Sequence, residues 1–161
     1  ARSLTFINSQ LKLFFYEILS LEFTKKNNKK IIYNHNILII LSFTVSVFFS
    51  FILYFFGQNI YEIWTLNKFN FDLNILLIFL ISINLRLIWV DKSFLISIFN
   101  KLQNFSYINF LMVILFILIT FLLVKNFGIL GFGISLISYE MIMVFLAFYF
   151  HKKNFLDDIK N

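Results

Sequence analysis

The chain has 161 residues, of which 60% are hydrophobic and 14% are charged, and its mean hydropathy is +0.86. A water-soluble domain of this length could not hide so much apolar surface in one core, so the composition excludes that class and indicates a membrane protein. The chain has no cysteine and no proline, which excludes disulfides, thiol chemistry and proline kinks.

The net charge of +6 comes from lysines that flank apolar segments. Nine of them precede, separate or follow the apolar stretches on one side of the expected topology: Lys25, Lys26, Lys29, Lys30, Lys92, Lys101, Lys152, Lys153 and Lys160. The other two connections hold only Lys68 and Lys125. Basic residues near span ends mark the cytoplasmic face, so we expect a cytoplasmic C-terminus. Because the cations flank segments of lipid length, we do not expect nucleic acid as a partner.

Before the first long apolar stretch, residues 4–21 form a weaker, amphipathic segment. Its apolar residues recur every three or four positions, as in a helix: Leu4, Ile7, Leu11, Phe14, Ile18 and Leu21. Polar residues including Lys12 and Glu17 interrupt this pattern. The segment could lie on the membrane surface, or it could be the end of an earlier spanning helix. Residues 22–35 are polar and are expected to form a cytoplasmic loop.

Four apolar stretches follow, and each is long enough to cross a bilayer, which takes about 20 residues. They cover residues 36–57, 73–99, 106–124 and 129–150, and a cytoplasmic tail over 151–161 follows them. The sequence therefore predicts an all-α, polytopic helical membrane protein with four transmembrane helices and an N-terminal amphipathic or partial helix.

In the first span, Ser42, Ser46 and Ser50 recur at steps of four. Such a row favours close helix packing over a polar cavity wall. We expect the following segment, residues 57–72, to be an external loop with Tyr61 and Trp64 as interfacial anchors.

The second span is long, about 40 Å if it forms one helix. Five of its polar residues fall within about 60° of one another at helical spacing: Ser82, Arg86, Ser93, Ser97 and Asn100. This alignment favours one continuous helix with a wet face over a span that ends near Val90. Asp91 and Lys92 point elsewhere and are expected to be interfacial charges.

The third span is almost purely apolar, which is typical of a helix that faces lipid or packs against neighbours. A tight turn follows it at residues 125–128, and Gly128 suits the backbone angles of such a turn. In the fourth span, Gly131, Ser135 and Ser138 share a face that predicts helix contact. Glu140 lies near mid-depth and points roughly the opposite way.

Arg86 and Glu140 are the leading site candidates, because a charge inside a span must pair, meet water or reach the headgroups. Arg86 could bind an anionic substrate, or it could be a structural or snorkelling residue. Glu140 could pair with Arg86, hold two helices together, or exchange a proton during transport. His35 and His151, at opposite ends of the membrane part, have no set of metal ligands nearby and are expected to be interfacial. We find no enzyme motif and expect no catalytic residue, metal or cofactor.

Three segments together resemble a known family. They are Phe56–Thr65 (FGQNIYEIWT), Phe99–Lys101 (FNK) and Lys125–Gly131 (KNFGILG). In this order, after a lysine-rich loop and before a basic tail, they resemble the C-terminal part of a polysaccharide flippase of the Wzx type. That family belongs to the multidrug/oligosaccharidyl-lipid/polysaccharide exporter superfamily. The resemblance covers about Phe14 to the end. It rests on sequence patterns typical of the family, not on a catalytic signature.

The resemblance implies a two-lobed transporter of the bacterial inner membrane that works by alternating access. Its substrate would be an undecaprenyl-pyrophosphate-linked oligosaccharide for surface polysaccharide or O-antigen synthesis. This chain would be part of one lobe, with the N-terminal lobe of the same protein and the lipid bilayer as its partners. Arg86, Ser82, Ser93 and Ser97 would then contact the substrate. Two alternatives remain: a cation-coupled drug antiporter of the same superfamily, and a structural subunit of a membrane complex.

Overall fold

The computed structural model describes residues 2–66, 68, 70–98 and 102–159, with side chains only between residues 9 and 153. Its four helices are α1 (Arg2–Thr24), α2 (Asn28–Thr65), α3 (Leu73–Ile98) and α4 (Leu102–Ile159). The structure is 94% helical, with no strand in the described part of the chain. Three of the helices are long and apolar enough to cross a membrane. The predicted class, an all-α helical membrane protein, is confirmed.

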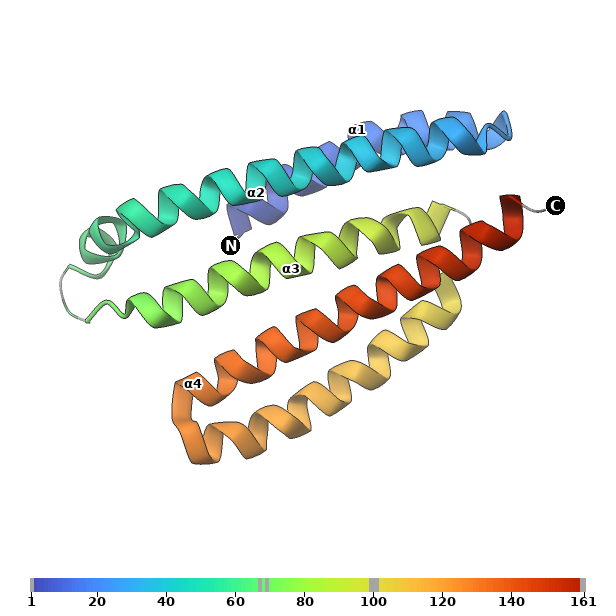
Figure 1. The fold of residues 1–161 in the computed structure, drawn as a ribbon. Helices are drawn as coiled ribbons and strands as arrows, with labels where there is room; N and C mark the ends of the chain where they lie inside the picture. The colour runs from blue at the N-terminus through green and yellow to red at the C-terminus, as the bar shows by residue number, and fades with distance from the viewer. Residues whose placement is uncertain (1, 67, 69, 99–101, 160–161) are drawn as a thin grey trace.

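Helix α4 is two antiparallel limbs joined by a sharp bend. The first limb covers residues 102–127 and the second residues 129–159, because Gly128 has a non-helical backbone (φ 58°, ψ −138°). Residues with side chains rarely adopt a positive φ, so glycine is what permits the reversal. Figure 1 shows the second limb lying between α3 and the first limb. The bend falls at the turn that the sequence predicted.

The bundle has two distinct ends (Figure 1). The α1–α2 turn, the last turn of α3 and the C-terminal end of α4 lie together, and we call this the basic end. The connection from α2 to α3 and the bend at Gly128 lie at the opposite end, the kink end. The segments richest in lysine therefore share one end, as their spacing predicted. Lys101 and Lys160 lie outside the described residues.

Helix α2 is longer than the predicted span. It starts eight residues earlier, where the Asn27 side chain accepts a hydrogen bond from the backbone N–H of Lys30, and it ends eight residues later. The expected external loop is thus helical up to Thr65. Hydropathy predicts where an apolar stretch ends, but the backbone hydrogen bonds of a helix can continue beyond that point. Trp64 remains 80% exposed, as expected of an interfacial anchor.

Helix α3 is one continuous helix of 26 residues, as the aligned polar side chains predicted. Its neighbour α2 packs against it through small residues, since Ser42 and Ser46 are 3% and 1% exposed. The packing role predicted for this serine row is confirmed at both positions. Ser50, the third member, accepts a hydrogen bond from the side-chain amide of Asn84 on α3 at 2.9 Å.

Helix α1 packs with a face that overlaps the predicted apolar stripe only in part, since Leu11 and Ile18 are half-buried. Phe14 and Leu21 of the expected apolar stripe are 64% and 58% exposed, whereas Phe15 and Leu19 are buried. Leu4 and Ile7 of that stripe lie outside the described side chains. The buried face carries Lys12, which an ion pair neutralises. The buried face of α1 therefore differs from the predicted stripe in part because it includes a polar contact, which hydropathy could not predict.

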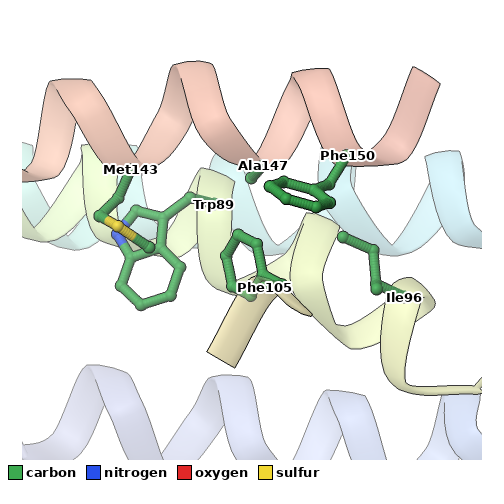
Figure 2. Close-up of a cluster of buried hydrophobic side chains, with 6 residues drawn as sticks. All are labelled: Trp89, Ile96, Phe105, Met143, Ala147 and Phe150. Atoms are coloured by element: carbon green, nitrogen blue, oxygen red, sulfur yellow. The ribbon is translucent and has the colours of Figure 1, made fainter. Parts of the chain in front are cut away.

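Two clusters of buried hydrophobic side chains hold the basic end. The first joins α1, α2 and α3: Phe15, Leu19, Ile31, Leu38 and Leu95. The second joins α3 to both limbs of α4: Trp89, Ile96, Phe105, Met143, Ala147 and Phe150. Figure 2 shows Met143 beside the Trp89 indole, and Phe150 close to Phe105. These clusters fix how the four helices face one another around the polar side chains described next.

Candidate functional site

Arg86 lies at the centre of α3, thirteen residues after Leu73 and twelve before Ile98. Its side chain is exposed. No ion pair or hydrogen bond of its guanidinium occurs within the described part of the chain. A rise of 1.5 Å per residue puts it roughly 18–20 Å from either helix end. An exposed guanidinium at this depth is costly against lipid, so its face must meet water or protein.

The three serines predicted to share the Arg86 face differ in exposure. Ser82 is 3% exposed and packed in the bundle, whereas Ser93 and Ser97 are half-buried. Each hydroxyl donates a hydrogen bond to a carbonyl of its own helix, over 2.8, 2.9 and 2.6 Å respectively. Their hydroxyl oxygens keep acceptor capacity. Asn100, the last member of the stripe, lies outside the described residues.

Glu140 is buried on the second limb of α4, at 2% exposure. The indole Nε1–H of Trp89 on α3 donates a hydrogen bond to its Oε2 at 2.5 Å. The Arg86 guanidinium is near enough to act on Glu140 electrostatically, but no ion pair joins the two among the described residues. Glu140 thus connects α3 to α4 through Trp89, and Arg86 stays available for another partner.

A groove of about 550 Å³ runs between α2 and α3. Its lining is apolar except for Ser50, Tyr54 and Asn84. Asn84 is two residues from Arg86, which is about 200° around the helix. The groove therefore opens away from Arg86, and its lining contains no cation for a phosphate group. Its chemistry suits a hydrocarbon chain.

The sequence did not predict a group of polar side chains that lies at the basic end. We call it the polar cluster: Lys12, His35, Asp91, Lys92 and His151. Every helix contributes to it. Asp91 is 1% exposed, and its Oδ1 forms an ion pair with Lys12 Nζ at 2.9 Å. Asp91, expected to be an interfacial charge, is therefore covered by α1 and is not exposed on the surface of the bundle.

The two histidines also meet in the polar cluster, although the sequence places them far apart. Their rings stack with centroids 6.0 Å apart and an interplanar angle of 21°. His35 is fully buried, and its Nε2 lies 2.8 Å from the backbone oxygen of Asp91. His35, expected to be interfacial, lies at the basic end but inside the bundle. Lys92 is half-buried, with Nζ 5.0 Å from the centroid of the Phe148 ring, a distance typical of a cation–π contact.

Two signals in the sequence could have indicated this cluster. Lys12 interrupts an otherwise apolar helical segment, and Asp91 is the one acid within the second span. Charges of opposite sign inside lipid-length segments are expected to find each other. Residue spacing does not tell which helices are neighbours, so the sequence could not predict that Asp91 is the partner of Lys12. Among the described residues, no group of three metal-ligating side chains occurs.

Comparison of this chain with protein-family models, with curated proteins and with solved structures finds no match.

Proposed function

We propose that this chain is the C-terminal portion of a Wzx-type flippase. It would move a lipid-linked oligosaccharide across the bacterial inner membrane, with its C-terminus in the cytoplasm. The order of sequence features that resembles this family supports the proposal, together with four apolar sequence segments of lipid length and lysine-rich connections gathered at one end.

The observation that carries the proposal is the exposed Arg86 in the middle of α3. A helix that faced lipid on this side would leave a guanidinium in hydrocarbon, at a cost of about 2.5–3.5 kcal/mol or more. A water-filled cavity between two lobes removes this cost. A purely structural subunit would need a partner acid at this depth, so transport accounts for the residue more simply.

The substrate chemistry fits the same residue. A pyrophosphate linkage carries negative oxygens, and a guanidinium can bind two of them at once with parallel N–H donors. Ser93 and Ser97 lie on the same helix face and offer hydroxyl oxygens toward the sugar. In this proposal Arg86 binds the pyrophosphate in the cavity while the lipid tail stays among apolar helices.

The test is an Arg86→Ala variant of the complete protein in cells that depend on it for surface polysaccharide. We expect export to fall at least about tenfold, because a hydrogen bond to a charged group is worth roughly 1.5–3 kcal/mol and each 1.4 kcal/mol is tenfold. Export is measured as surface glycan per unit of flippase in the membrane fraction. Arg86→Lys should restore it only in part, since an ammonium lacks the bidentate fork.

Lys125→Ala is the matched control, because Lys125 is also an exposed cation but lies at the kink end. This variant should export normally. Normal export by Arg86→Ala at normal membrane abundance would refute the proposed role. A glycan-independent loss of drug resistance would instead favour the antiporter alternative.

A further inference from the structure

His35 lies within the polar cluster, where it stacks on His151 of α4, is hydrogen-bonded to the α3 backbone at Asp91 and is within electrostatic range of Lys12 on α1. It is on α2 and is fully buried. Lys12 on α1, Asp91 and Lys92 on α3, and His151 on α4 surround it. A change in the charge of His35 would therefore alter its electrostatic interactions with groups on all of the other helices at the basic end.

The hydrogen bond of His35 fixes its tautomer. The backbone oxygen of Asp91 can only accept, so the neutral imidazole must carry its hydrogen on Nε2 and donate it over 2.8 Å. The other ring nitrogen, Nδ1, then holds a free lone pair. This atom is buried and has no hydrogen-bond partner among the described residues. It is a base inside the protein, positioned to take a proton.

In the observed arrangement, the groups around His35 disfavour the protonated imidazole. A proton on Nδ1 would create a buried N–H with no hydrogen-bond partner among the described residues, which costs about 1–3 kcal/mol or more for a charged group. The new charge would lie beside Lys12, Lys92 and the stacked His151. The carboxylate in the cluster, Asp91, already binds Lys12. Protonated His35 would have to draw Asp91 away from Lys12 or reach water.

We propose that His35, stacked on His151 beside the Lys12–Asp91 ion pair, is a proton-binding site that holds the basic end closed when neutral and opens it when protonated. The proton adds to Nδ1 of His35 and leaves from the same atom, so no other reactant is needed. Opening separates the ends of α2 and α4 and lets the Asp91 carboxylate or water solvate the imidazolium. That this site would couple transport to a proton gradient rests on the proposed function, whereas the pH-dependent opening does not.

The test measures the distance between two helices as a function of pH. The chain has no native cysteine, so spin labels can be placed at chosen pairs. Tyr33→Cys on α2 and Tyr149→Cys on α4 are suitable, because both residues are well exposed and each is two positions from a histidine. Electron spin resonance of the labelled protein in lipid vesicles would give the distance distribution at about pH 8 and about pH 5, the range over which imidazole titrates.

We expect the longer-distance population to rise at least about tenfold between about pH 8 and about pH 5 if the open state has the ordinary proton affinity of imidazole and the closed state binds the proton about a hundredfold more weakly, since a ligand shifts an equilibrium only by its differential affinity. A control pair at the kink end, Ile60→Cys and Ile129→Cys, is equally exposed and should respond much less. His35→Phe keeps a ring of similar size without the basic nitrogen and should abolish the response.

Two results would overturn the inference. One is a distance distribution that is the same at both pH values. The other is a pH response that persists in His35→Phe, or that appears equally at the kink end. If His35→Phe does not insert, His35→Gln must abolish the response, because its amide can still donate to the backbone oxygen of Asp91 but takes up no proton. No substrate is involved, so this outcome is independent of the Arg86→Ala export result.

Discussion

The two ends of the bundle are held together by different chemistry. At the basic end, a buried ion pair, a histidine pair and both hydrophobic clusters join the helices. At the kink end, backbones approach closely past small residues: a Cβ built on Gly131 would lie 2.2 Å from the backbone oxygen of Leu123. Ser135 nearby shares a hydrogen bond with Thr120 across the two limbs, at 2.8 Å.

We expect the two ends to differ in how strongly their contacts respond to pH. Contacts at the basic end depend on charge, so protonation or a change of partner can release them. Contacts at the kink end depend on shape and backbone approach, which pH does not alter. If the protein alternates between two states, we expect the basic end to move and the hairpin of α4 to move as one piece.

The largest expected effect comes from removing one charge at the basic end. Asp91→Asn leaves the Lys12 ammonium beside a neutral amide in a buried site, and breaking such a pair costs about 3–5 kcal/mol. Because Lys12 keeps 17% of its side chain exposed, we expect about 3 kcal/mol, the lower end of that range. The free energy of unfolding in detergent micelles measures it.

A matched double variant distinguishes an unpaired charge from lost packing. Lys12→Met with Asp91→Leu replaces both charges by apolar groups, and such replacements are often neutral or stabilising. We expect it to recover most of the loss. A double variant as unstable as Asp91→Asn alone would show that the ion pair is not what makes this region sensitive.

At the kink end, Gly131→Ala should destabilise the hairpin of α4. The added methyl group meets backbone, which cannot rotate away as a side chain can. Overpacking of this kind costs about 1–3 kcal/mol. The same unfolding measurement applies. Ser138→Ala on the exposed side of the same limb is the control and should change stability by less than about 0.5 kcal/mol. Equal effects at both positions would argue against close backbone contact.

Hydrophobic length and local chemistry were enough to predict most of the architecture. The spans, the bend at Gly128 and the continuity of α3 follow from runs of apolar residues, a glycine and aligned polar side chains. These features depend on neighbours in sequence. Gly131 and Ser135 were predicted to form a contact face and are buried, while Ser138 of the same stripe is exposed. The row of small residues therefore predicted which side of the second limb makes the contact, but not how far along the limb that contact extends.

The polar cluster could not be predicted in the same way. Lys12 pairs with Asp91, and His35 stacks on His151, across separations of many tens of residues. Helical periodicity gives the angle of a residue on its own helix, but not which helix lies opposite or at what height. Arg86 was identified because a charge inside a span is unusual by itself. Its role stays a prediction that the export experiment tests.

The smallest expected effect concerns the link between α3 and α4, where Trp89 donates a hydrogen bond to Glu140. Trp89→Phe removes the donor and keeps an aromatic ring in the hydrophobic cluster of Figure 2. Hydrogen bonds between membrane helices are worth about 0.6 kcal/mol on average and up to about 1.7 kcal/mol. We expect the loss of unfolding free energy to fall in that interval.

Trp64 provides the control for this variant, because it is the other tryptophan of the chain and is 80% exposed. Trp64→Phe should leave the unfolding free energy unchanged in micelles. A Glu140→Gln change keeps an acceptor for the indole N–H, so it should cost less than Trp89→Phe. If Glu140→Gln is instead the more damaging of the two, the negative charge itself matters, and the nearby Arg86 guanidinium becomes the partner that explains it.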